Sequence, residues 1–230
     1  MTGMTAPPEL LTEPLPSDPL QVASQWLAEA YRLGLQPNPN AMTLATSTRG
    51  GHPSARVVLC KELVVIPGYL VFYTNYLSRK GDELATNPRA AAVLYWDYLH
   101  RQVRIEGLVV KAPEQDSDAY FTSRALQSRI GAWASAQSQP LKSRSELLAS
   151  VAAVARRFGI EREAQDGRAD DAPVPRPPHW GGYRLWADAV ELWVEGEARI
   201  HDRARWSRAL ARHRDGRIEP GAWHATRLQP

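Results

Sequence analysis

The chain has 230 residues, 43% of them hydrophobic and 23% charged, which is ordinary for a globular protein of one or two domains. Its apolar runs stay short of the roughly 18 residues that a membrane-spanning helix needs, and its single cysteine, Cys60, excludes an intramolecular disulfide and a cysteine-based zinc cluster. A formal charge of +3 is too small to indicate nucleic-acid binding, but it suits small phosphorylated ligands. Because no apolar leader segment opens the sequence, we expect a cytoplasmic protein without a membrane or nucleic-acid partner.

The first half of the chain predicts one helix followed by strands. Residues 1–16 are rich in proline and lack periodicity, so we expect a flexible segment there, followed by one domain over residues 17–230. A helix should begin at Ser17 or Asp18 with Pro19 in its first turn, and end near Gly34. Alternating apolar residues then predict strands over 41–46, 55–61, 69–74, 89–96 and 101–111, with a short helix over 78–87.

The second half predicts helices first and strands again at the end. Residues 114–134 should be helical in two pieces, and a capping box at Ser143 should open a helix that reaches about Phe158. Residues 165–178 form a polar, proline-rich connector that we expect to be mobile. Strands are predicted over 183–186, 189–194, 199–208 and 222–228. Evenly spaced strands with short turns favour an antiparallel barrel with peripheral helices, without βαβ units, a glycine-rich dinucleotide motif or a P-loop.

Three basic side chains alternate along a predicted strand that follows the turn-rich sequence Trp180-Gly-Gly182. Alternation places Arg199, His201 and Arg203 on one face of that strand. Their mutual repulsion disfavours a core position, so the face suits an anionic or electron-rich ligand. A solvated edge strand is the alternative.

Polar residues in four other segments could bind a ligand. Arg56 and Lys61 bracket an apolar strand and point to opposite faces, where they serve two ligand groups or simply reach solvent. Arg79 and Lys80 lie in the first turn of a predicted helix, which is electrostatically costly unless a phosphate binds there; a solvated helix start is the alternative. The nearby strand residues Tyr73 and Thr74 add hydroxyl groups to this predicted phosphate site.

A second predicted phosphate site lies in the helical region. Tyr120, Arg124 and Ser128 are spaced four residues apart and share one face of a continuous helix, although the same pattern fits an exposed face. Gln137 and Ser138 in a polar loop, and Gln102 on a strand, could hydrogen-bond to a ligand. The histidines lack metal-binding spacing, so no metal is expected, and Cys60 should be a buried, inert strand residue.

Taken together, these segments resemble the pyridoxamine 5′-phosphate oxidase family, from about Asp18 to Pro230. The resemblance implies a homodimeric, FMN-dependent split β-barrel in which both subunits contribute to each FMN site. The motifs that carry it are Arg56-Val-Val-Leu-Cys-Lys61, Phe72-Tyr-Thr-Asn75, Ser78-Arg-Lys80, Arg101-Gln-Val103, Tyr120-Phe-Thr-Ser-Arg124, Gln127-Ser-Arg-Ile-Gly-Ala-Trp133, Trp180-Gly-Gly182 and Arg199-Ile-His-Asp-Arg203.

The resemblance also assigns roles to residues. Lys61, Tyr120, Arg124 and Ser128 match positions that hold the substrate phosphate, while Arg199 and His201 match catalytic positions beside the pyridine ring. The positions that match FMN contacts are Arg56, Val57, Val58, Leu59, Cys60, Lys61, Tyr73, Thr74, Arg79, Lys80, Gln102, Gln137, Ser138, Trp193 and Arg203.

The implied reaction is oxidation of pyridoxamine or pyridoxine 5′-phosphate to pyridoxal 5′-phosphate, with oxygen as acceptor and hydrogen peroxide as product. The sequence departs from the family pattern at Ala125, where a proline is common, and around Trp193. Leu192 precedes Trp193 in place of an aromatic residue, and Val194-Glu195 follow it in place of Gln-Gly. We expect Leu192 and Val194 to face away from whatever Trp193 contacts, and Glu195 to share the Trp193 face and weaken the binding of an anionic cofactor.

Two alternatives stay open. One is a related flavin oxidase that acts on another heterocycle, such as a phenazine precursor. The retained phosphate-binding positions Lys61, Tyr120, Arg124 and Ser128 argue against it. The other is a split-barrel module that binds flavin or haem without turnover. Arg199 and His201 argue against that module, because cofactor storage does not need them.

Overall fold

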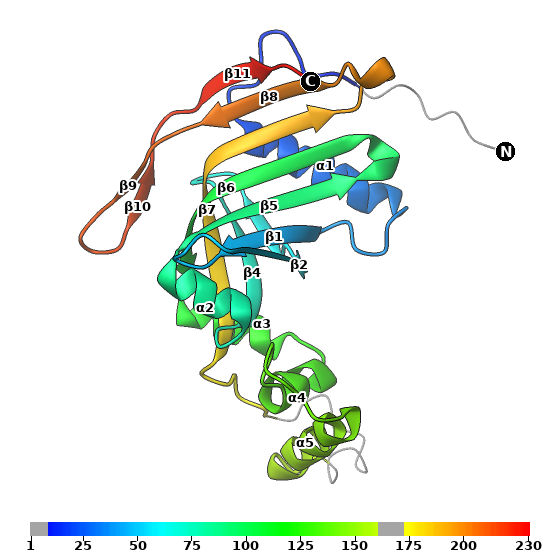
Figure 1. Cartoon of the computed structure of the whole chain (residues 1–230), viewed down its shortest axis with the longest axis vertical. Coiled ribbons are helices and arrows are strands. Elements are labelled where there is room, and N and C mark those ends of the chain that lie inside the picture. Colours follow the sequence, from blue (N-terminus) through cyan, green and yellow to red (C-terminus); the bar gives the residue numbers. More distant parts are fainter. Residues whose placement is uncertain (1–8, 161–172) are drawn as a thin grey trace, which may run out of the picture.

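One antiparallel sheet of nine strands forms the body of the structure, a computed structural model that describes residues 9–160 and 173–230 (Figure 1). Seven strands follow the order β11-β8-β7-β6-β5-β1-β2, while β4 pairs with β7 and β3 pairs with β4. Because β7 pairs with β4 along its first half and with β8 along its second, the sheet curls into a half-barrel. The nine strands are β1 (Ala41–Ser47), β2 (Pro53–Leu59), β3 (Glu62–Val64), β4 (Tyr69–Asn75), β5 (Arg89–Trp96), β6 (Arg101–Lys111), β7 (Trp180–Val194), β8 (Asp202–Ser207) and β11 (His224–Leu228).

Side-chain alternation explains why these segments form a curled sheet with one buried face. Along β5 and β6 every second residue is buried, and Ala92, Leu94, Val103 and Ile105 are fully enclosed. The antiparallel, mainly β fold predicted from the sequence is therefore confirmed. A separate hairpin, β9 (Leu210–Arg212) with β10 (Ile218–Pro220), projects from the sheet and was not predicted, because its strands have only three residues each.

The described residues contain five α-helices: α1 (Pro19–Leu33), α2 (Arg79–Thr86), α3 (Glu114–Thr122), α4 (Leu126–Ala134) and α5 (Arg144–Arg157). The Asp18 carboxylate caps α1 by accepting the Leu20 backbone N–H at 2.9 Å, and Gly34 ends it at a φ of 62°. The helices α4 and α5 pack on each other and extend away from the sheet (Figure 1). No helix in the described ranges is long and apolar enough to cross a membrane.

Strand β7 is one continuous strand of 15 residues, where the sequence predicted two shorter ones. Its register against β6 shifts between Glu106 and Gly107, and such a bulge lets a strand bend. Residue 107 must be glycine, because a Cβ there would lie 1.8 Å from the Trp186 carbonyl oxygen. The break in apolar alternation that suggested two strands therefore marks a bend. The predicted turn at Trp180-Gly-Gly182 is also wrong, since these residues open β7.

The strand predicted over 199–208 begins later than expected. Residues Glu197–Arg199 form a short 3₁₀ turn, in which Ala198 and Arg199 adopt left-handed φ values of 53° and 65°. Only from Asp202 does the chain become β8. The alternation had predicted that Arg199 and Arg203 share one face of a strand. This prediction is wrong, because Arg199 lies in the turn before β8.

Residues 9–16 lie against the β8–β11 edge of the sheet. The Leu11 backbone N–H donates to an Asp202 carboxylate oxygen at 2.7 Å, and the Trp206 indole N–H donates to the Pro16 carbonyl oxygen at 2.8 Å. The remaining part of the predicted flexible segment, residues 1–8, and residues 165–172 of the predicted connector lie outside the described residues.

Candidate active site

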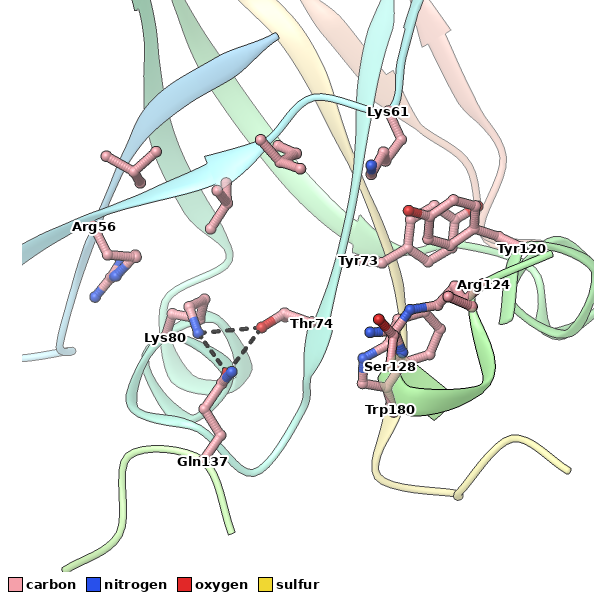
Figure 2. A pocket seen from close by; sticks show the side chains of 14 residues that line it. Arg56, Lys61, Tyr73, Thr74, Lys80, Tyr120, Arg124, Ser128, Gln137 and Trp180 are labelled. Atoms are coloured by element: carbon pink, nitrogen blue, oxygen red, sulfur yellow. Dashed lines mark hydrogen bonds between the residues drawn. The ribbon is translucent and has the colours of Figure 1, made fainter. Parts of the chain in front are cut away.

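A pocket of about 640 Å³ opens between β2, β4, α2, the α3–α4 region and the start of β7, a size typical of small-molecule sites (Figure 2). The structure brings together most of the side chains that the sequence had singled out in the first 140 residues. Ala125 and Trp180 also line it, although neither was assigned to a site from the sequence. The lining residues are Arg56, Val57, Val58, Leu59, Lys61, Tyr73, Thr74, Lys80, Tyr120, Arg124, Ala125, Ser128, Gln137 and Trp180.

One wall of the pocket is built around the Lys80 ammonium group. Its Nζ donates to Thr74 Oγ1 and Ser78 Oγ, each at 3.1 Å, and to Gln137 Oε1 at 2.8 Å (Figure 2). Burial, helped by the nearby Arg56 charge, lowers the pKa of Lys80 to about 8. Lys80 is therefore a cation near neutral pH, held by neutral oxygen atoms rather than by a carboxylate.

A buried carboxylate, Glu83, organises the guanidinium groups beside Lys80. Its Oε2 accepts hydrogen bonds from Thr46, Ser54 and Arg56, and its Oε1 accepts one from Arg79 Nε at 2.9 Å. Burial alone would raise the pKa of Glu83, but these hydrogen bonds outweigh it and lower the pKa to about 2. The cluster thus holds three cations and one anion, an excess of positive charge that suits a phosphate.

The opposite wall is aromatic and carries a second cationic group. The Tyr73 and Tyr120 rings stack at 4.0 Å between centroids, and the Trp180 ring lies nearly parallel to both. The Arg124 guanidinium lies 4.6 Å from the centre of the Trp180 ring, and Lys61 Nζ lies 5.5 Å from the Tyr120 ring (Figure 2). Within the described residues, the buried Arg124 Nη1 has no hydrogen-bond partner, so its N–H groups can bind an anion.

The predicted continuous helix face of Tyr120, Arg124 and Ser128 is interrupted. Helix α3 ends at Thr122 and α4 begins at Leu126, so Arg124 lies in the link between them. The three side chains still converge on the pocket, because the chain turns around it. In the same way Lys61 lies beyond the end of β2 and turns into the pocket that Arg56 lines from within the strand.

Three predicted cofactor residues lie beside this pocket rather than on its wall. Arg79 and Ser138 line a neighbouring pocket of about 460 Å³. Cys60 is buried, and its Sγ donates to the Glu62 carbonyl oxygen at 3.3 Å. Burial raises the pKa of the Cys60 thiol to about 12, so it stays protonated and inert.

The remaining predicted residues form a second cluster at the far end of β7: Gln102, Trp193, Arg199, His201 and Arg203. Within it the Trp193 and His201 rings lie 4.7 Å apart, and Gln102 pairs with Trp193 in the sheet register. The Arg203 Nε and Nη2 atoms donate to Oε1 of the buried Glu191 at 3.1 and 2.8 Å. The Gly196 backbone N–H donates to His201 Nδ1 at 3.2 Å.

The unusual neighbours of Trp193 are accommodated within the chain. Leu192 and Val194 are fully buried on the core face of the sheet, as predicted. Glu195 follows the strand, and its Oε2 lies 2.5 Å from His100 Nδ1. The carboxylate that we expected to oppose an anionic cofactor therefore has a hydrogen-bond partner of its own.

Within one chain the two clusters do not meet. Trp180 and Trp193 occupy the two ends of the 15-residue strand β7, roughly 40 Å apart along the strand at about 3.3 Å per residue. Sequence spacing could not reveal this separation, because it depends on the continuity of β7. A mononucleotide bound at one end cannot reach the other within the same chain.

Comparisons with known proteins identify the family. Residues 27–157 match the model described as pyridoxamine 5′-phosphate oxidase, and residues 180–230 match the pyridoxine 5′-phosphate oxidase C-terminal dimerisation region. Relatives named pyridoxine/pyridoxamine 5′-phosphate oxidase, from Rubrobacter xylanophilus and Burkholderia orbicola, are 46% and 47% identical over 213 residues, which is 93% of this chain and 87% and 89% of theirs.

The solved structures agree on the fold. PhzG from Burkholderia lata, in complex with tetrahydrophenazine-1-carboxylic acid, has a TM-score of 0.79 at 30% identity and covers 98% of this chain and 100% of its own. A pyridoxamine 5′-phosphate oxidase-related, FMN-binding protein from Nostoc punctiforme shares the fold, with a TM-score of 0.64 at 16% identity over 92% of this chain and 98% of its own. By sequence and by fold, the chain belongs to the pyridoxamine 5′-phosphate oxidase family.

Proposed function

We propose that the protein is an FMN-dependent oxidase that converts pyridoxamine or pyridoxine 5′-phosphate to pyridoxal 5′-phosphate, with oxygen as acceptor and hydrogen peroxide as product. Oxidation of the alcohol gives the aldehyde directly, whereas oxidation of the amine gives an imine that water hydrolyses with release of ammonia. The observation that carries this proposal is a single pocket with two separate cationic groups, Lys80 with Arg56 on one wall and Arg124 with Lys61 on the other. Two phosphorylated molecules, a cofactor and a substrate, need two such groups.

The chemistry of the donor set fits the FMN phosphate. Lys80 would supply a compact charge and Arg56 a planar fork of N–H groups, while Thr74 and Gln137 complete the hydrogen-bonding wall. The excess of positive charge around Glu83 also suits a dianion. When bound, FMN supplies the acceptor for the hydride that leaves the exocyclic carbon of the substrate.

The substrate phosphate would bind on the aromatic wall. Arg124 would present its free N–H groups, Lys61 a second charge, and Tyr120 and Ser128 their hydroxyl groups. These contacts would fix the pyridine ring against the flavin, because hydride transfer depends mainly on alignment. Arg199 and His201 would then orient and polarise the amine or alcohol, and His201 could hold or release a proton there.

A homodimer would join the two clusters. The match of residues 180–230 to a dimerisation region supports this arrangement, as does the position of the second cluster at the far end of β7. In a twofold dimer, Gln102, Trp193, Arg199, His201 and Arg203 of one copy would complete the pocket of the other.

The alternative of a phenazine-type oxidase draws support from the structural similarity to PhzG. The higher identity to relatives named pyridoxine/pyridoxamine 5′-phosphate oxidase and the second cationic group favour a phosphorylated substrate. The purified protein should be yellow, or become yellow with FMN, and should oxidise pyridoxine 5′-phosphate with release of peroxide. A protein that stays colourless with FMN, or that oxidises only an unphosphorylated heterocycle, contradicts the proposal.

A complementation experiment tests the shared site. Arg124→Ala and Arg199→Ala should each lose most of the activity at a low concentration of pyridoxine 5′-phosphate, because each removes one half of every site. The co-expressed population should recover about one quarter of wild-type activity, since half of its dimers are mixed and each mixed dimer contains one intact site of two. No recovery in dimers shown to be mixed contradicts the arrangement.

A further inference from the structure

We propose that Trp180 is a positioning residue that holds the Arg124 guanidinium in the pocket and thereby gives the enzyme its preference for phosphorylated over unphosphorylated substrates. The proposal rests on the proposed function, because that function assigns the substrate phosphate to Arg124. Sequence reasoning gave Trp180 no role in the site, and it lies at the start of β7 on the pocket wall.

Few groups in the described part of the chain hold the Arg124 side chain in place. The residue lies in the link between α3 and α4, outside either helix. Among the described residues no carboxylate forms an ion pair with it, and its buried Nη1 has no hydrogen-bond partner. Its charged group instead lies 4.6 Å from the Trp180 ring centre and 5.7 Å from that of Phe121. The Trp180 ring is therefore the main surface against which Arg124 is held.

The Trp180 ring is itself held in place. It lies within 12° of the plane of Tyr73 and within 11° of that of Tyr120. Gly182 pairs with Tyr73 across the strands, and a Cβ at position 182 would lie 2.8 Å from the Tyr73 ring and 2.9 Å from Ala112 Cβ. Gly182 thus leaves room for a parallel aromatic platform, which we define as the rings of Tyr73, Tyr120 and Trp180.

An aromatic support differs in its consequence from a carboxylate. Glu83 holds Arg56 and Arg79 by accepting their N–H groups, so part of their charge and donor capacity is used within the protein. A ring face attracts a guanidinium without accepting its in-plane N–H groups. Within the part of the chain that the structure describes, Arg124 is therefore positioned with its Nη1 group unpaired, which favours a ligand with phosphate oxygens over one with a hydroxyl.

The test compares Trp180→Leu and Trp180→Phe holoenzymes with pyridoxine 5′-phosphate and with pyridoxine. We expect W180L to raise KM for the phosphorylated substrate roughly tenfold more than KM for pyridoxine, the scale of a desolvated cation–π contact. W180F keeps a ring face and should stay within about threefold of wild type. Trp133 is the matched control, because Arg157 lies 4.8 Å from its ring but neither residue lines the pocket. W133L should not change the ratio between the two substrates.

A second readout does not depend on turnover. Inorganic phosphate added to the wild-type holoenzyme should change its tryptophan fluorescence, and W133F should keep this change while W180F loses it. If W180L does not fold, this titration with folded W180F decides the question. A signal that survives in W180F, or an unchanged substrate ratio in folded W180L, overturns the role of Trp180.

Arg124→Ala separates this inference from the proposed function. If R124A abolishes the preference for the phosphorylated substrate and W180L does not, only the role of Trp180 fails. If R124A leaves the preference intact, the proposed substrate site itself is wrong.

Discussion

Replacing Glu83 by glutamine should destabilise the protein in a strongly pH-dependent way. The carboxylate is 4% exposed and accepts hydrogen bonds from two hydroxyl groups and two guanidinium groups. The difference between its ordinary pKa of 4.5 and the value of about 2 in the folded chain corresponds to about 3 kcal/mol, at roughly 1.4 kcal/mol per pH unit. The folded-state pKa is the lower one, so this stabilisation is present above pH 4.5 and is lost as the pH falls towards 2.

Guanidinium-chloride unfolding of both proteins at pH 7 and pH 3 measures the effect. We expect E83Q to lower the free energy of unfolding by about 3 kcal/mol at pH 7. At pH 3 the difference in this free energy between wild type and E83Q should be only about 1 kcal/mol. Glu106→Gln is the control, because Glu106 is partly exposed and its ion pairs with Arg104 and Arg205 are also partly exposed, where an ion pair contributes less than about 1 kcal/mol. An equal difference in the free energy of unfolding between the two proteins at both pH values refutes the stabilising role of the ionised Glu83 carboxylate.

Three further predictions follow from the packing. FMN affinity should fall as the pH rises through about 8, where Lys80 loses its charge. Equilibrium titration with FMN should show a weaker dependence of affinity on pH in Lys80→Gln than in wild type, and an equally strong dependence contradicts this. Glu191→Ala leaves Arg104 and Arg203 without their buried partner. It should lower the free energy of unfolding, measured by chemical denaturation, by about 3–5 kcal/mol, and a decrease below about 1 kcal/mol would contradict this. Gly182→Ala should cost about 1–3 kcal/mol through overpacking. Gly131→Ala, in open space within α4, should raise the melting temperature slightly, and equal melting shifts for the two glycines would refute the packing argument.

Local physical rules accounted for much of the fold. The bounds of β5 and β6 follow from alternation, because both strands bury one face against the core. The start of α1 follows from the Asp18 cap and Pro19. The continuity of β7 could not be predicted in this way, because the bulge within it at Asp188, opposite Glu106 and Gly107, is a tertiary feature that interrupts its alternation.

In the candidate site, too, some features could be predicted from the sequence and others depend on the tertiary structure. The motifs identified the chemistry of the pocket residues, since cations and hydroxyl groups stand out in otherwise apolar segments. Sequence alone could not give the separation of the pocket at the Trp180 end of β7 from the second cluster at its Trp193 end, which depends on the length of β7. Nor could alternation give the conformation of Arg199, which lies in the left-handed region. The partnership of Glu195 with His100 joins residues far apart in the chain and left no local signal.

Strand β7 also limits how the protein can change in evolution. Its Trp180 end lines the pocket and its Trp193 end carries the second cluster, while Leu192 and Val194, on either side of Trp193, are buried in the core. One inserted or deleted residue would exchange the two faces, so that Leu192 and Val194 would point outwards and Trp193 into the core. Substitutions at either end can alter the chemistry one side chain at a time. The length of the strand, however, should stay constant, because the insertion or deletion of one residue would disrupt the core and the second cluster together.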